Sequence, residues 1–273
     1  MNRYRPSRTI RVDARPERPF RGPAGWIEGI GFAGLALLSC IGLYLGILVG
    51  ASRLDLPAFA ASLRQAGLSI LPVMTLTSVV VGLILGHQTQ AILAWFDVPG
   101  LVLVSIAHAV VMELIPLLVG ILVAGRAGVA LAVRQATLTV SGEMDGLLVN
   151  GVDPIRFTLG PVLLAMLLMS FAFTVWGSLI TFGVTALWLW SMADLPPALF
   201  LDALIRALSP GDLLDALLKP MFFAVLIGLI AIVNGTAAGR DPQGIAQAAT
   251  RTMIGAVAAI LFADLLAILL LRG

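Results

Sequence analysis

The amino-acid sequence predicts an all-α integral membrane protein with a single polytopic domain. Hydrophobic residues make up 59% of its 273 residues and charged residues only 12%, about half of the roughly 25% that a soluble domain carries. The apolar residues also lie in long continuous runs, close to the roughly 20 residues that a helix needs to cross a bilayer. A transmembrane β-barrel would instead show segments of about ten residues with alternating polarity. These observations exclude an ordinary soluble domain.

The apolar runs lie at residues 27–50, 66–86, 101–124, 158–190, 213–235 and 252–271. Their orientation follows from the flanking basic residues, because cytoplasmic loops of membrane proteins carry an excess of Lys and Arg. The segment 125–157 contains Arg126, Arg134 and Arg156, whereas the segment 87–100 contains neither Lys nor Arg. We therefore place 125–157 on the cytoplasmic side. Alternating sides from there predicts five spans within residues 66–273 and a C-terminus on the outer side.

The first 25 residues form a basic tail that we expect to be retained, disordered and cytoplasmic. Its arginines are Arg3, Arg5, Arg8, Arg11, Arg15, Arg18 and Arg21. A tail of this kind is held near anionic lipid head groups, and nucleic-acid binding is not favoured because basic patches are generic. If residues 27–50 crossed the bilayer, the tail would lie outside, against the charge bias. We therefore expect residues 26–65 to form an interfacial elbow helix and a connector.

Charged residues within the predicted spans are the candidates for a functional interior. Glu113 and Lys219, the only lysine, each lie close to a proline. An ionised side chain in the bilayer costs several kcal/mol unless it is paired or faces water. Both should therefore point into the helix bundle, either as a structural pair or as the polar lining of a cavity. Asp264 is a third candidate that could instead hydrogen-bond a neighbouring helix.

Catalytic motifs are not recognisable in the sequence. Cys40 is the single cysteine, and His87 and His108 are too far apart for a helical zinc motif. No nucleophile elbow is present, and Lys219 is not followed by the Ser or Thr of a phosphate-binding loop. We expect neither an enzyme nor a cofactor in this chain, so any ATP–Mg hydrolysis would take place on a partner.

The polar island GEMDGLLVNGVDPIR at 142–156 lies between two long apolar segments. It is preceded by AGRAG and the helix-compatible VALAVRQATLTV. Asp153 is suited to cap the following helix and Pro154 to occupy its first position. We expect a short cytoplasmic helix, a turn and a return to the membrane near Phe157. The segment is either a solvated connector or a lever that transmits motion from a cytoplasmic motor.

Three segments carry a resemblance to a known family. They are ELIPLLVGILVAGRAG at 113–128, the polar island, and AAGRDPQGIAQAATRTMIGAV at 237–257. Together they resemble the permease subunit of MlaE-type ABC lipid transporters, over about residues 60–271. The resemblance implies an elbow helix, five spans and a short coupling helix. It also implies a permease of the bacterial inner membrane that pairs with a second copy as a homodimer. Such a permease moves phospholipids or related lipids between the inner membrane and a periplasmic carrier.

The same resemblance supplies partners and site residues. The partners it implies are a P-loop ATPase, a periplasmic MCE-domain protein, in many systems a STAS-domain protein, and a second permease copy. Residues assigned to ATPase coupling are Glu143, Asp145, Gly151, Asp153, Pro154 and Arg156, and those assigned to the lipid cavity are Glu113 and Lys219. The family often has Arg before the glutamate, where this chain has Met112. The cavity is then less charged, so sterol-like or other hydrophobic substrates stay open.

Two other functions are compatible with part of the sequence. An autonomous channel or proton-coupled secondary transporter would use Glu113, His108 and Asp264, but no convincing internal repeat of the kind common in secondary transporters is visible. A scaffold subunit would tolerate mutation of every interior charge. For His108, a hydrogen-bonded interior or interfacial position is the simpler interpretation.

Overall fold

The computed structural model describes residues 23–50, 56–95, 99–239 and 241–271. Within these residues the regular structure is helical throughout, and six helices are long and apolar enough to cross a membrane. They are α1 (Pro23–Leu48), α3 (Leu71–Leu93), the rod Gly100–Ser141, α8 (Pro154–Ala193), α10 (Pro210–Thr236) and α11 (Pro242–Leu271). The predicted all-α membrane fold is confirmed. Most of the predicted basic tail, residues 1–22, lies outside the described residues.

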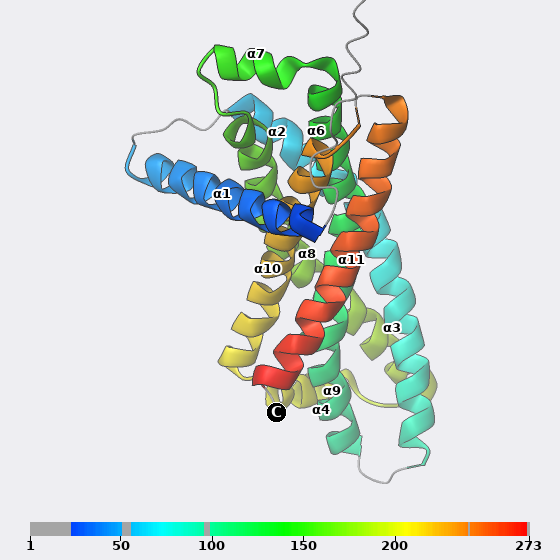
Figure 1. Cartoon of the computed structure of the whole chain (residues 1–273). Helices are drawn as coiled ribbons and strands as arrows, with labels where there is room; N and C mark the ends of the chain where they lie inside the picture. Colours follow the sequence, from blue (N-terminus) through cyan, green and yellow to red (C-terminus); the bar gives the residue numbers. More distant parts are fainter. Residues whose placement is uncertain (1–22, 51–55, 96–98, 240, 272–273) are drawn as a thin grey trace, which may run out of the picture.

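Helix α1 runs across the bundle at a steep angle to α3, α10 and α11 (Figure 1). It packs against α8 and α10, with Ala36 and Cys40 fully buried. The Tyr44 hydroxyl donates a hydrogen bond to the Gly160 carbonyl at 2.8 Å. Many other apolar side chains of α1 are exposed, Ile27 and Leu38 among them. The steep angle of α1 to the other helices suits the predicted elbow helix. The position of α1 at the membrane interface stays a prediction.

Helices α2 (Leu56–Leu63) and η1 (Arg64–Leu68), a π-helical turn, lead into α3. The span begins at residue 71, five residues later than predicted, with Pro72 in its first turn. Helix α3 packs closely along α8, because Gly82 has no side chain to separate them. A Cβ at Gly82 would lie 2.7 Å from the Thr181 carbonyl oxygen, and the Thr185 hydroxyl donates to the Gly82 carbonyl at 3.1 Å.

A single helical rod contains the second predicted span and continues beyond it. Its parts are α4 (Pro99–Ala109), η2 (Val110–Leu114), α5 (Ile115–Val123), η3 (Ala124–Gly128) and α6 (Val129–Ser141). At 1.5 Å per residue the rod is about 60 Å long, roughly twice the hydrocarbon thickness of a bilayer. The helix-compatible residues 129–140 therefore extend the spanning helix and do not begin a separate one.

The polar island forms the turn at one end of the bundle. Gly142 ends α6 with φ of +77°, a conformation that glycine adopts readily. The short helix α7 (Glu143–Val149) follows, and Figure 1 shows it at the end of the bundle. The Asp153 carboxylate then accepts a hydrogen bond from the Ile155 N–H at 2.9 Å, with Pro154 in the first turn of α8. The predicted cap and return to the bundle are confirmed, and the short helix falls on the island itself.

Helix α9 (Pro197–Ala207) lies at the opposite end of the bundle, beside α4 (Figure 1). Its Phe200 and Ala203 are buried with Leu103 of α4 and Leu189 of α8. The sequence analysis missed this helix. The described C-terminal end of α11 lies at the same end of the bundle as α9, so α7 and the end of α11 are at opposite ends.

The core lies where the rod, α8, α10 and α11 meet. Its largest fully buried side chains include Phe223, Ile227, Leu163 and Met166. Two of these helices contain an internal proline and continue past it: α8 contains Pro161 and α10 contains Pro220. The packed core sets the helices in fixed positions around the charged residues described next.

Candidate functional sites: an interior charge cluster and a terminal helix

Lys219 of α10 binds two carboxylates from two other elements. Its Nζ lies 2.5 Å from Glu113 Oε2 of η2 and 2.5 Å from Asp264 Oδ1 of α11. The side chains of Lys219, Glu113 and Asp264 are 16%, 27% and 8% exposed. The sequence left open whether Glu113 and Lys219 pair, and the structure shows that they do. It also brings in Asp264, so we call the three residues the Lys219 cluster.

The backbone of the rod contributes a fourth group to this cluster. Lys219 Nζ donates to the Met112 carbonyl oxygen at 3.0 Å. In an uninterrupted α-helix that carbonyl would accept from the N–H of residue 116, but Pro116 has none. The π-helical turn η2 ends two residues before this proline, and π-helical turns are frequent at functional sites. The local sequence thus leaves an oxygen available to the lysine.

The two carboxylates of the cluster are bound differently. Glu113 accepts a hydrogen bond from Lys219, whereas the contact with Asp264 has an ion-pair distance but not the geometry of a hydrogen bond. A buried ion pair is costly to disrupt, because removing one partner leaves an uncompensated charge. Lys219 therefore holds the rod, α10 and α11 together, and its loss would leave two acids facing each other.

His108 lies on α4 and binds a different element. Its Nδ1 is 3.3 Å from the Ala207 carbonyl oxygen of α9, and the side chain is half-buried. This confirms the interpretation of His108 as a hydrogen-bonded residue of the interior or interface. Glu113 and Asp264 meet at Lys219, and none of the contacts described for His108 joins it to them.

Helix α7 exposes apolar side chains at the end of the molecule. None of its residues is buried, and Leu148 and Val149 are 60% and 88% exposed. Glu143 and Asp145 lie in its first turn, where the helix dipole favours acidic residues. Its short length and lack of burial mean that α7 has few contacts of its own to stabilise it.

The remaining island residues connect α7 to α8. Gly151 has φ of +72°, so a side chain there would strain the turn. Arg156 Nε lies 3.4 Å from Asp153 Oδ2 in a partly exposed ion pair. The guanidinium of Arg156 also approaches α1, lying 3.7 Å from where a Cβ of Gly42 would be. The island thus sits beside α1.

Comparison with known proteins decides the family. The sequence profile of the Permease MlaE family matches residues 59–270. The chain belongs to the MlaE permease family. The match agrees with the resemblance over about residues 60–271 and covers the Lys219 cluster and α7, while all of α1 lies before it.

Individual relatives of this MlaE-family chain are distant but extensive. It is 27% identical over 241 residues to the intermembrane phospholipid transport system permease protein MlaE of Haemophilus influenzae, covering 85% of this chain and 90% of the relative. A probable ABC transporter permease of Rickettsia prowazekii is 26% identical over 202 residues, 73% of this chain and 77% of the relative. The chloroplastic protein TRIGALACTOSYLDIACYLGLYCEROL 1 of Arabidopsis thaliana is 29% identical over 159 residues, which cover 58% of this chain and 45% of the relative.

One residue of this MlaE-family permease that the sequence analysis missed ties α7 to the core. Gln135 of α6 is fully buried, and its Nε2 lies 3.3 Å from Thr236 Oγ1 of α10 and 3.3 Å from Met144 Sδ of α7. Its side-chain oxygen has no hydrogen-bond partner. A glutamine that follows an arginine near the end of an apolar segment resembles any solvated helix end, so the sequence offered no signal for this contact.

Proposed function

We propose that this chain is the membrane subunit of an ABC transporter that moves phospholipids or related hydrophobic lipids between the bacterial inner membrane and a periplasmic MCE-domain carrier. Hydrolysis of ATP–Mg would take place on a separate P-loop ATPase. A second permease copy completes the transporter, and a STAS-domain protein is a further partner. Family membership and the names of the relatives support lipid transport. The observation that carries the coupling to an ATPase is the exposed apolar helix α7.

The two ends of the bundle favour one orientation. Four arginines lie in elements near the α7 end: Arg64 in η1, Arg126 in η3, Arg134 in α6 and Arg156 in the first turn of α8. The other end exposes Trp95 and Trp190, and tryptophan is enriched at membrane interfaces. Arg206 of α9 is paired there with Asp202 at 2.8 Å. By the positive-inside rule, α7 lies in the cytoplasm and the C-terminus on the periplasmic side.

Helix α7 is suited to act as the coupling element. Apolar residues as exposed as Leu148 and Val149 are costly in water and favour contact with a partner surface. Glu143 and Asp145 add negative charge beside them, which would favour a basic surface on the ATPase. Asp153 and Pro154 fix the start of α8, so a force on α7 would reach α8 through this short turn.

A second connection leads from α7 into the core. Met144 contacts Gln135, and Gln135 in turn contacts Thr236 of α10. Further along, the same rod and α10 are joined by the Glu113–Lys219 pair. Two helices tied at two places move as one unit more readily than two separate helices. We infer that movement of α7 shifts this unit and changes the polar environment that Glu113 and Lys219 present to the transported lipid.

The test is a mild-detergent purification of the full chain expressed with its partners. The double substitution Leu148→Asp and Val149→Asp should abolish co-purification of the ATPase and transport, because two charges would replace the apolar contact. The matched control is Leu201→Asp, an exposed leucine of α9 at the other end of the bundle, which should keep the ATPase bound. Full ATPase stoichiometry and full transport in the double variant would exclude α7 as the docking helix.

The same purification separates the proposal from its main rival. A stoichiometric P-loop ATPase together with an MCE-domain protein supports the transporter, and the lipids that co-purify identify the substrate class. A chain that purifies alone and conducts ions or solutes in liposomes would overturn it in favour of a channel or proton-coupled carrier.

A further inference from the structure

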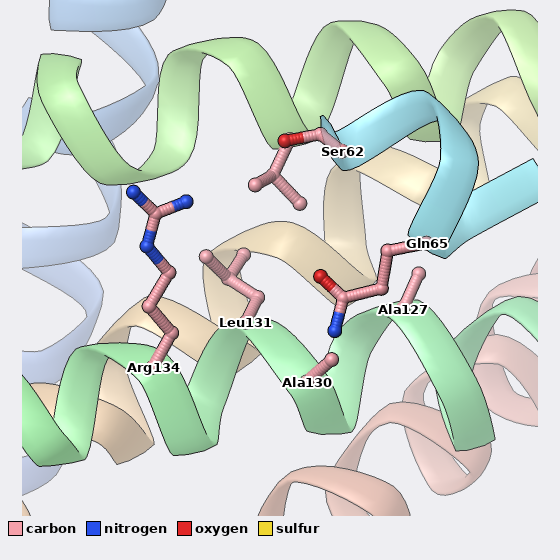
Figure 2. A pocket seen from close by; sticks show the side chains of 7 residues that line it. Ser62, Gln65, Ala127, Ala130, Leu131 and Arg134 are labelled. Carbon is pink, nitrogen blue, oxygen red and sulfur yellow. The ribbon is translucent and has the colours of Figure 1, made fainter. Parts of the chain in front are cut away.

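A small cleft opens between neighbouring helices toward the α7 end of the bundle. Its walls are α2 and η1 on one side, α6 on the other, and Val162 of α8. Ser62, Gln65 and Arg134 supply its polar groups. Figure 2 shows the Gln65 amide and the Arg134 side chain on either side of Leu131, with Ser62 on the opposite wall. Neither the Lys219 cluster nor α7 contributes to this cleft.

Arg134 is the charged residue among those that line the cleft, and the neighbouring charges in the two segments that form its walls are also positive. Residues 56–68 and 124–141 contain Arg64, Arg126 and Arg134 and no Asp or Glu. Among the described residues, Arg134 takes part in none of the ion pairs. Its guanidinium carbon instead lies 5.8 Å from the centroid of the Phe157 ring, a cation–π contact that holds the side chain in place without neutralising it. A half-buried positive charge without an acidic partner favours an anion.

The Gln65 amide can complete the coordination of an anion, whereas the single hydroxyl proton of Ser62 is already donated within α2. The Gln65 amide reaches over the cleft from η1 and has two N–H donors. Ser62 is buried, and its hydroxyl donates to the Ala58 carbonyl at 2.8 Å. A guanidinium and a neutral amide that line the same cleft from its two sides suit phosphate oxygens, because the guanidinium can donate two parallel hydrogen bonds.

The size and surroundings of the cleft decide which phosphate compound fits. The enclosed volume is about 10 Å³, room for roughly one water molecule. A ligand must therefore lie across the mouth and insert only its phosphate oxygens. Leu56 and Leu68, which flank the polar wall, are both 67% exposed. Exposed leucines beside arginines are typical of a helix at the boundary between head groups and acyl chains.

We propose that this cleft binds the phosphate of an anionic phospholipid from the cytoplasmic leaflet. The lipid bridges α2–η1 and α6 and so fastens the segment that follows α1 to the long rod. The cleft shares no lining residue with the Lys219 cluster or α7, and the proposal requires only that the α7 end faces the cytoplasm. Binding to the folded chain alone stabilises the fold, so occupancy is visible as a rise in unfolding temperature.

The experiment uses the full chain alone in mild detergent, with phosphatidylglycerol or phosphatidylcholine added at equal concentration. Bound lipids are counted by native mass spectrometry, and unfolding temperatures are measured in parallel. The wild type should retain phosphatidylglycerol in preference and unfold at a higher temperature with it. Arg134→Gln should weaken this retention about tenfold, the effect of losing one charge-assisted contact. No ATPase is needed, so failure of this site and failure of the proposed transport function are distinguishable.

Two further variants make the result decisive. Arg206→Gln removes the same charge from α9 at the opposite end and should leave the lipid preference unchanged. Gln65→Glu places a carboxylate over the cleft without altering the contact between Arg134 and Phe157, and it should also reduce phosphatidylglycerol retention. If Arg134→Gln fails to fold, Gln65→Glu decides alone. Wild-type preference in the folded variants would overturn the proposal, as would equal stabilisation by the same concentration of inorganic phosphate.

Discussion

At the scale of single residues, Lys219 joins three elements through two carboxylates and one backbone oxygen. Glu113 and Lys219 were expected to point inward because a charge facing lipid is costly. Their pairing with each other and with Asp264 depends on how three helices are rotated about their axes. The Met112 carbonyl became a partner only because Pro116 cannot donate to it. Rotations and local helix defects of this kind are set by packing, which the sequence does not display.

Replacing Lys219 tests whether the cluster is structural or part of the lipid path. Lys219→Met leaves Glu113 and Asp264 without their counter-ion. We expect the free energy of unfolding to fall by about 2 to 4 kcal/mol. This loss is at the low end of the range for broken buried ion pairs, because Glu113 is partly exposed. The measurement is thermal unfolding in detergent. The triple variant Lys219→Met, Glu113→Gln and Asp264→Asn removes all three charges and should recover most of the stability. A single variant as stable as wild type would show that the pair contributes nothing.

The same variants report on function. If the triple variant is stable and still transports lipid, the cluster is a structural tie between helices. If it is stable but transports poorly or co-purifies with different lipids, the charges act on the lipid. We expect the second result, because Glu113 keeps a substantial exposed fraction within the bundle.

At the scale of elements, the sequence predicted where charged segments interrupt the apolar runs but not where helices end. Residues 125–157 were expected to lie on the cytoplasmic side of the membrane as a loop with a short helix, yet the rod continues through 129–141 to Gly142. Composition marks where a chain leaves the membrane, and a helix can extend past that point. Helix α9 was missed because its 11 residues are too few to form a span and its polar residues resemble those of a loop. The Asp153 cap was predictable because capping depends on local sequence alone.

The turn between α7 and α8 should be more important for coupling than for stability. Replacing both Asp153 and Pro154 by alanine removes the cap and the fixed first turn of α8, a stability loss of about 1 kcal/mol. We expect ATP hydrolysis to continue while lipid transport falls, because the turn would no longer transmit movement. Reconstituted transport and ATPase rates, measured on the same sample, give the ratio that matters.

The matched control for that turn lies at the other end of the molecule. Ser209 caps α10 and exchanges hydrogen bonds with Asp212, so Ser209→Ala removes a similar cap far from α7. It should cost a similar stability and leave the coupling ratio unchanged. Wild-type coupling in the variant lacking Asp153 and Pro154 would assign that turn the role of a passive connector.

At the scale of the whole molecule, the number of bilayer crossings determines where the two ends of the chain lie. Six helices have the length and composition to cross, but α1 runs across the others and packs on α8 and α10 (Figure 1). Five crossings place the N-terminus and C-terminus on opposite sides, and six place them on the same side. The rod carries arginines and leads to α7. By the positive-inside rule, these arginines assign the α7 end of the bundle to the cytoplasm.

Cysteine labelling tests this arrangement with few changes, because Cys40 is the single cysteine. In a Cys40→Ala background, Gly273→Cys should react with a membrane-impermeant maleimide added to cells whose outer membrane has been made permeable. Asn2→Cys and Val149→Cys should react only after the inner membrane is also opened, since the elbow keeps the N-terminus on the α7 side. Labelling of both Asn2→Cys and Gly273→Cys while the inner membrane is intact would mean that α1 crosses the bilayer. The seven tail arginines would then lie on the outer side, contrary to the positive-inside rule. Labelling of Val149→Cys before the inner membrane is opened would show the opposite orientation. Helix α7 would then lie outside the cytoplasm, where a cytoplasmic ATPase could not bind it.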